Sequence, residues 1–334
     1  MNPDLISKLE QLIRRDPGQR GLLGQSTPGQ SFGMGSLARA AAELAENAQR
    51  VVLVTGFYIP SGIVAASETD GPPGTVYLTK MLEQLGIKAQ IVTDTHSESA
   101  VKSAARAVDL DPELVHIVPL KPEPEWHRHF YESGPGCGLT HLIAIERAGP
   151  GHTTETFQSQ YPDLDINEFL SQVPPEKQGC CHNMRGLSID EWNAPLHELF
   201  EQLPHFHPQA LTMGIGDGGN EIGMGQLDWQ QIQACLPLEG TSHIPCRVAT
   251  DEIIVAGTSN WGALALTAAI AILKQRPDIL APWTAEHHLQ LLERMVEKGP
   301  AVDGVTGRPE ATVDGLPFLT YIQPWQMMRQ LLEI

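Results

Sequence analysis

The sequence predicts a three-layer α/β fold, with a mostly parallel sheet that carries helices on both faces. The first observation is a set of short apolar runs, such as VVLVTG at 51–56 and AQIVTD at 89–94, which are typical of strands buried on both faces. The second is that helical segments alternate with these runs, as crossovers between parallel strands require. The third is that 41% of the 334 residues are hydrophobic, enough to build a core. The expected arrangement is Rossmann-like.

The first half of the chain supplies three of the expected strands. A helix is predicted over 4–15, because apolar residues recur there at helical spacing. A polar, glycine-rich stretch at 16–35 separates it from the next elements. These are an alanine-rich helix at 36–50, a strand at 51–56, a helix at 74–85, a strand at 89–94, a helix at 97–108 and a strand at 114–118.

The second half supplies three more strands, at 141–145, 210–215 and 252–256. The run at 262–273 is the longest strongly apolar one, and it is too short for a membrane span of roughly 20 residues. It is therefore predicted to be a buried helix.

Residues 149–188 interrupt the alternation. This stretch contains HTTETFQSQYPDLD and CCHNMRG, and it is too long for an ordinary connection between elements. It is predicted to be an insertion near the active site or a mobile lid. We expect one α/β domain over 1–334, with an N-terminal helical segment at about 1–35.

Charge and targeting signals narrow the class of protein. The chain has 22 Lys and Arg against 40 Asp and Glu, a formal charge of −18, which argues against nucleic acid or an anionic membrane as the partner. Residues 1–20 are charged throughout and lack the apolar run of a signal peptide. The five cysteines form no CxxC pair, so a reduced, cytoplasmic protein is expected. A homo-oligomer is left open.

The first unusual loop is ETDGPPG at 68–74. Asp70 is suited to cap the helix that follows, which would be a purely structural role. Alternatively, Asp70, Gly71 and Gly74 would bind substrate, with the free N–H groups at the helix start holding a substrate carboxylate.

The second unusual loop is GIGDGGNEIGMG at 214–225, in which six of twelve residues are glycine. It lacks the Gly-Lys-Ser/Thr of a phosphate-binding P-loop and fits the GxGxxG fingerprint poorly. A tight turn capped by its acids is the structural alternative. The functional alternative places Asp217 and Glu221 in catalysis, with substrate contacts from Gly218, Gly219 and Asn220.

The third loop is GTSNWG at 257–262, where Ser259 or Asn260 could cap the next helix or bind substrate. Two arginines are candidate carboxylate clamps: Arg147, which follows the strand at 141–145, and Arg185 in HNMRG. Ordinary ion pairs are the alternative for both. Because loops after parallel strands gather at one edge of a sheet, we expect the three loops to share one cleft.

Seven motifs occur in an order that resembles the D-glutamate cyclase family. They are TGF at 55–57, ETDGPPG at 68–74, IERAG at 145–149, NMRG at 183–186, GIGDGGNEIGMG at 214–225, AGTSNWGALAL at 256–266 and VDGLPF at 313–318. The similarity runs from about residue 30 to the end of the chain. It implies a lyase that interconverts D-glutamate and 5-oxo-D-proline plus water, with a small amino acid as partner.

That reaction sets three chemical requirements. A base must deprotonate the substrate ammonium, and we expect Asp217 or Glu221 in this role. Backbone N–H groups of the two glycine loops are expected to stabilise the developing oxyanion, and a general acid must protonate the departing hydroxide so that it leaves as water. Both substrate carboxylates must also be held, and Arg147 and Arg185 are expected to hold the α-carboxylate. No cofactor is required, although Mg²⁺ or Mn²⁺ on Asp70, Asp217 or Glu221 is an alternative.

Two other functional classes stay open on the sequence alone. One is a phosphate- or nucleotide-handling enzyme that uses the glycine-rich loops as anion cradles. The other is a protein that binds an amino acid or lactam without catalysis.

Overall fold

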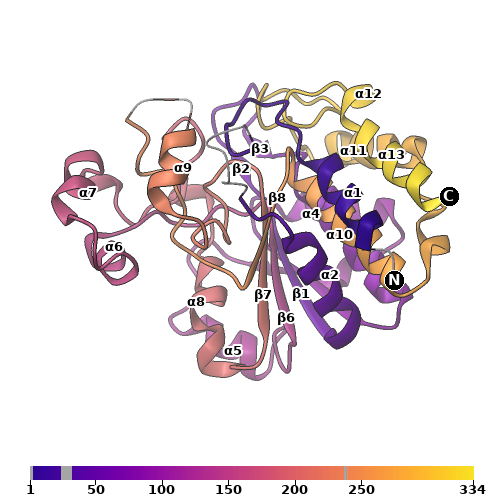
Figure 1. Cartoon of the computed structure of the whole chain (residues 1–334), viewed down its shortest axis with the longest axis horizontal. Helices are drawn as coiled ribbons and strands as arrows, with labels where there is room; N and C mark the ends of the chain where they lie inside the picture. Colours follow the sequence, from indigo (N-terminus) through magenta and orange to yellow (C-terminus); the bar gives the residue numbers. More distant parts are fainter. Residues whose placement is uncertain (1–2, 24–31, 237, 239) are drawn as a thin grey trace.

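A six-stranded, all-parallel sheet forms the centre of the molecule and confirms the predicted fold class (Figure 1). The structure is a computed structural model, and it describes residues 3–23, 32–236, 238 and 240–334. The strands lie in the order β5-β4-β1-β6-β7-β8. Their bounds are β1 Arg50–Thr55, β4 Lys88–Asp94, β5 Val115–Val118, β6 His141–Ile145, β7 Leu211–Gly216 and β8 Glu252–Val255.

The strand order places a switch point beside β1. This strand pairs with β4 on one side and β6 on the other, so Val51 lies opposite both Ala89 and His141. The chain therefore adds β4 and β5 on one side of β1 and then β6, β7 and β8 on the other side. In open α/β sheets, ligands bind at the carboxyl ends of the strands at such a point. Here that position is beside Thr55 and Ile145.

Different sets of helices cover the two faces of the sheet. Val51 and Leu53 of β1 belong to one apolar core, whereas Val52 and Val54 belong to the other, as the alternation of side chains along a strand requires. The first core is covered by α1 Pro3–Ile13, α2 Ser36–Asn47, α3 Pro72–Gln84, α4 Glu98–Ala107, α10 Ser259–Leu273, α11 Ala285–Lys298 and α13 Gln323–Leu332. The second is covered by α5 Trp126–Glu132 and α8 His197–Phe206.

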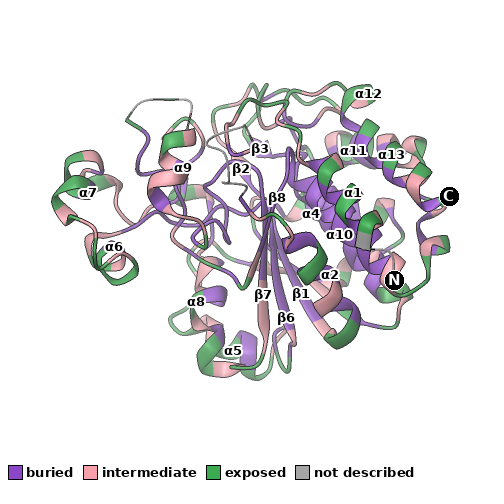
Figure 2. Ribbon diagram, viewed as in Figure 1, coloured by how far each residue is buried: buried purple, intermediate pink, exposed green. Residues whose placement is uncertain are grey.

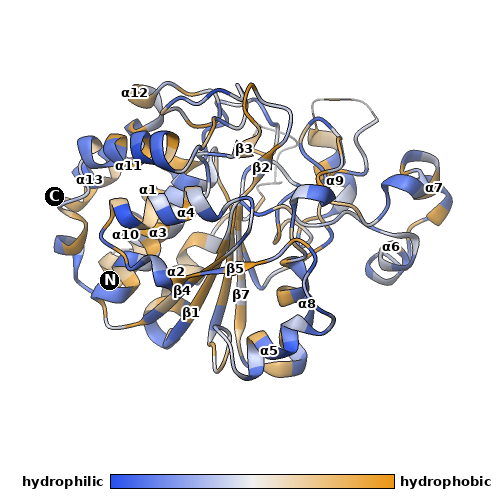
Figure 3. Ribbon diagram, turned by 180° about the vertical axis from the view of Figure 1, so that it is seen from behind, coloured by the Kyte–Doolittle hydropathy of each residue, from blue (hydrophilic) through white to orange (hydrophobic). Residues whose placement is uncertain are grey.

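Helix α10 is buried over most of its length, as the apolar run predicted (Figure 2). No helix among the described residues is both long enough and apolar enough to cross a membrane. The strands are apolar, while the surrounding helices turn hydrophilic residues outward (Figure 3).

The interruption at 149–188 contains two short helices, α6 Thr154–Gln160 and α7 Ile166–Gln172, which project from the body of the molecule (Figure 1). They enclose a small apolar core of Phe157, Phe169 and Val173 with Trp229 of α9, Trp229–Cys235. The segment then returns to the carboxyl edge of the sheet at residues 183–185. Of the predicted N-terminal helical segment, Pro3–Ile13 is helical and residues 24–31 lie outside the described part.

Candidate active site

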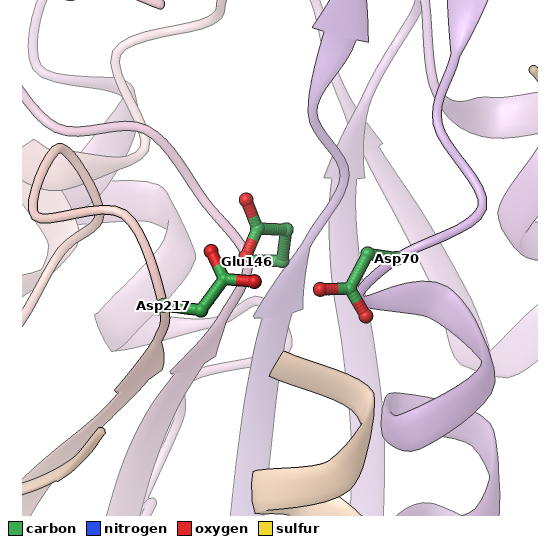
Figure 4. A group of neighbouring side chains, drawn as sticks. All are labelled: Asp70, Glu146 and Asp217. Atoms are coloured by element: carbon green, nitrogen blue, oxygen red, sulfur yellow. The ribbon is translucent and has the colours of Figure 1, made fainter. Parts of the chain in front are cut away.

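Three carboxylates from separate parts of the chain meet at the carboxyl edge of the sheet. Asp70 precedes α3, Glu146 follows β6 and Asp217 follows β7. Each offers an oxygen that lies within 4.8 Å of the others (Figure 4). The structure thus brings the first two glycine loops to one place, beside the switch point.

A cavity of about 460 Å³ opens over two of these carboxylates, Glu146 and Asp217, whereas Asp70 is not among the described residues that line it. Its acidic part is lined by Glu68, Glu146, Asp217 and Glu221, with Arg20 beside them. Its outer part is largely apolar and is lined by Phe57, Ile59, Ile63, Met184 and Val305. Arg185 also lines this outer part. The cavity therefore joins a charged inner end to an apolar opening.

Arg20 is the cation of the inner end. Its guanidinium contacts Asp217 Oδ1 and donates to Asp314 Oδ1 at 2.7 Å, while only 17% of its side chain is exposed. Burial alone would lower the pKa of Arg20, but the surrounding carboxylates, Asp314 and Glu146 first among them, raise it above its usual value. Arg20 is therefore fixed as a permanent positive charge.

Three carboxyls in or beside the inner end, those of Glu146, Asp70 and Glu68, hold their protons tightly. Burial, together with repulsion from Glu221 and Asp70, raises the pKa of Glu146 well above the usual value. Burial and the charge of Asp314 raise the pKa of Asp70 to about 8. The pKa of Glu68 is also raised well above its usual value, by burial first. One guanidinium thus faces several acids, some of them protonated near neutral pH.

Glu146 also has an unusual backbone. Its φ is +47°, a left-handed conformation that non-glycine residues rarely adopt and that clusters at functional sites. Ser259 Oγ donates to Glu146 Oε2 at 2.5 Å, and Glu146 is 6% exposed. The strand end and α10 together aim this carboxyl at the cavity.

The loops before α3 and α10 cap each other. Asp70 accepts the backbone N–H groups of Ser259 and Asn260 at 2.7 and 2.8 Å. Asn260 Oδ1 in turn accepts those of Gly71 and Gly74 at 3.1 and 2.8 Å. The structure therefore assigns Asn260 a capping contact, and the N–H groups expected to bind a carboxylate already have a protein acceptor.

The glycine-rich loop folds around its own acid. Glu221 accepts the backbone N–H groups of Asp217, Gly218 and Gly219 at 3.0, 2.7 and 2.7 Å. Asn220 lines the cavity, and its side chain donates to His182 O at 2.8 Å. The N–H groups of this loop, which the sequence predicted to stabilise an oxyanion, therefore already donate to Glu221. Asp217 Oδ2, in contrast, is buried and has no hydrogen-bond partner among the described residues.

The two predicted arginine clamps lie in different places. Arg147 donates to Asp94 at 2.6 Å and to the carbonyls of Gly56 and Ala194 at 2.8 Å, is 1% exposed, and is not among the residues that line the cavity. These contacts are those of a buried structural ion pair. Arg185 is exposed at the cavity opening, where its side chain donates to Val305 O at 3.3 Å.

Sequence reasoning missed Arg20, Glu68 and Asp314 as members of the site. Arg20 lies in an irregular segment after α1, where Asp16 accepts the N–H groups of Arg20 and Gly21 at 2.9 and 2.8 Å. An Asp-Pro-Gly turn signature just before Arg20 was the available signal. Asp314 has a φ of +54°, and the Asp-Gly pair that marks such turns was visible in VDGLPF.

The Asp70, Glu146 and Asp217 oxygens are also the described atoms best placed to hold a metal ion. Carboxylate oxygens are hard ligands that suit Mg²⁺ or Mn²⁺. However, Arg20 already brings a positive charge to Asp217, and both oxygens of Asp70 accept N–H groups.

Comparison with known proteins agrees with the motifs. A family model described as D-glutamate cyclase-like, C-terminal, matches residues 9–173 and 162–332, so the two matched segments meet inside the interruption at 149–188. The human mitochondrial D-glutamate cyclase is 28% identical over 268 residues, which are 80% of this chain and 39% of that protein. The chain thus spans less than half the length of the human protein. By the extent of the model match, the chain belongs to the D-glutamate cyclase-like, C-terminal family.

Proposed function

We propose that this protein catalyses the interconversion of D-glutamate and 5-oxo-D-proline plus water. The observation that carries the proposal is the pairing of two unlike acids in one cavity. Asp217 is held beside Arg20, and one of its oxygens has no partner among the residues that the structure describes, whereas Glu146 has a pKa raised by burial and by neighbouring acids. Titratable groups with such different surroundings are suited to serve as base and acid. The name of the human relative supplies the substrate.

Asp217 is the proposed base. Asp217 Oδ2 is buried, and no donor from the described part of the chain bonds to it, so the substrate ammonium can provide the missing hydrogen bond. The charge of Arg20 favours the ionised carboxylate, which is the form that accepts a proton. Transfer of that proton leaves the α-amine free to attack the γ-carboxyl carbon.

Glu146 is the proposed acid. Lactam formation removes two protons from the α-nitrogen, and the departing γ-oxygen gains two as it leaves as water. A carboxyl whose pKa is raised well above its usual value keeps its proton to higher pH and can donate one of these protons. The other is one of the protons that the α-nitrogen gives up to the base. Ser259 Oγ holds the acid in position through its bond to Oε2.

Arg20 and Arg185 are the proposed binding cations. Arg20 lies in the buried end of the cavity, where charge on the γ-carboxyl oxygens develops, and a fixed guanidinium there stabilises that charge without reorganisation. Arg185 lies at the opening and is placed to hold the α-carboxylate.

The test is to incubate the pure protein separately with D-glutamate, L-glutamate and each 5-oxoproline enantiomer, and to follow interconversion by chiral chromatography. We expect D-glutamate and 5-oxo-D-proline to interconvert and the L enantiomers to remain unchanged. Binding of D-glutamate without turnover would instead favour a non-catalytic binding protein. An Arg185→Gln variant is expected to raise KM more than it lowers kcat, because Arg185 contacts a part of the substrate that does not react.

A further inference from the structure

The guanidinium at the inner end of the cavity already serves two carboxylates of the protein. Among the lining residues that the structure describes, the guanidinium groups are those of Arg20 and Arg185. Arg20 already contacts Asp217 and Asp314, so a γ-carboxylate bound there would be the third carboxylate on one guanidinium. Arg185 is left to hold the α-carboxylate. The Asp217 carboxylate would repel this γ-carboxylate, and the protonated Glu68 and Glu146 would add no positive charge to offset the repulsion.

A neutral γ-group would avoid that repulsion. In a γ-amide of glutamate, the second carboxylate is replaced by an uncharged carbonyl, while the α-ammonium and α-carboxylate are retained. The Asp217 carboxylate then faces only the ammonium, which it attracts. The charge distribution of the cavity thus suits an amide better than an acid.

The outer half of the cavity provides room for a substituent on that amide. Ile63 and Val305 line it and are 73% and 47% exposed. Their loops are held together by a bond from Ile63 N to Gly307 O at 3.0 Å, so this apolar wall is built from two linked segments. A volume of about 460 Å³ also lies within the roughly 300–1,000 Å³ of pockets that enclose drug-sized ligands, which are far larger than glutamate.

From these observations we infer that the site also accepts γ-glutamyl amides that carry an apolar amine, and releases that amine as it forms 5-oxoproline. This inference rests on the proposed function and names a further substrate class for the same residues. The α-nitrogen attacks the γ-carbonyl carbon, a new C–N bond closes the ring, and the C–N bond to the amine breaks. The α-ammonium loses two protons and the amine gains two as it departs as an ammonium ion, so no co-reactant is needed.

The experiment compares D-glutamate, D-glutamine and γ-D-glutamyl-n-butylamide as separate substrates, with 5-oxo-D-proline and released butylamine measured by chromatography. D-Glutamine has the neutral γ-group without the apolar extension, so it separates the two parts of the argument. We expect kcat/KM to rise from D-glutamate to D-glutamine and again to the butylamide.

An Ile63→Ser variant tests the apolar wall separately from the intrinsic reactivity of each substrate, because the two substrates are compared in the wild type and again in the variant. The ratio of kcat/KM for the butylamide to that for D-glutamine is expected to fall about tenfold in this variant, the loss typical of one apolar contact in a pocket. The matched control is Leu319→Ser in α12, Phe318–Tyr321, because Leu319 is 77% exposed and does not line the cavity. It should leave the ratio unchanged.

The outcomes separate the inference from the proposed function. Turnover of D-glutamate without turnover of either amide would overturn the inference and leave the proposed function standing. Turnover of the amides alone would support the inference and refute D-glutamate as the substrate. An unchanged ratio in Ile63→Ser would overturn the assignment of the apolar wall, whatever the absolute rates.

Discussion

Replacement of Asp217 by asparagine is the sharpest perturbation of the proposed mechanism. Asparagine keeps the shape of the side chain, and its amide oxygen can still accept from Arg20. Arg20 also keeps Asp314, to which it donates at 2.7 Å, so no buried charge is left without a partner. We therefore expect Asp217→Asn to fold normally while losing the ability to take a proton from the substrate.

The expected loss of rate follows from that single change. Removal of a general base costs about 10²–10⁴ in rate, which is roughly 3–5 kcal/mol of transition-state stabilisation at 1.36 kcal/mol per tenfold. The assay measures formation of 5-oxo-D-proline by chiral chromatography, together with the thermal melting temperature of the same preparation.

A matched control is available at the opposite end of the same strand. Asp251 accepts the N–H and hydroxyl of Thr212 at the start of β7, each at 2.7 Å, far along the strand from the cavity. Asp251→Asn should turn over at close to the wild-type rate. If Asp217→Asn also turns over at the wild-type rate, the base lies elsewhere and the assignment is wrong.

Four further outcomes are expected. Glu221→Gln should lower the free energy of unfolding, measured by urea denaturation, by about 3 kcal/mol, because three N–H groups lose a charged acceptor. A change under about 0.5 kcal/mol would refute this prediction. Arg147→Met should lower the free energy of unfolding by about 3–5 kcal/mol in the same assay, because Asp94 is left buried without its cation. An unchanged free energy of unfolding would show that the ion pair contributes no stability. The melting temperature should fall as pH rises from about 4 to 8, because burial raises the pKa of Asp70 from 3.8 to about 8 in the folded state. Asp70 therefore binds more protons in the folded protein than in the unfolded chain across that pH range, and folding is favoured at the lower pH. A melting temperature that rises from pH 4 to 8 would contradict this prediction. EDTA should leave the turnover rate unchanged, because Arg20 supplies the positive charge; a loss restored by Mn²⁺ would assign the Asp70, Glu146 and Asp217 oxygens to a metal ion.

The fold was predictable because its strands are buried on both faces. A strand such as β1, with Val51–Val54 fully buried, must be apolar along its length, and this leaves a signal that needs no knowledge of the partner strands. The helix α10 is equally visible because it is buried nearly all round. By contrast, α6 and α7 are short, and only a few of their residues enter a core, so their pattern was lost among polar residues.

The site was predictable only where a loop carries its own signature. The glycine-rich loops were recognisable from composition, and the sheet topology then explains why Asp70 and Asp217 meet. What composition could not reveal is which atoms are free. Glu221 and Asp217 are equivalent in the sequence, yet Glu221 is enclosed by three N–H groups, whereas one oxygen of Asp217 has no partner within the described ranges of the chain. Arg20 comes from nearly 200 residues away along the chain, so only the tertiary structure could place it there.

The central claim is that Asp217 handles the substrate nitrogen inside this cavity. The most direct measurement is a crystal structure of the protein with 5-oxo-D-proline bound. We predict that the ring nitrogen lies within about 2.6–3.2 Å of the Asp217 carboxylate, the distance of a functional proton transfer, with the lactam carboxylate on Arg185. A lactam bound outside the cavity, or one whose ring nitrogen faces away from Asp217, would contradict the claim.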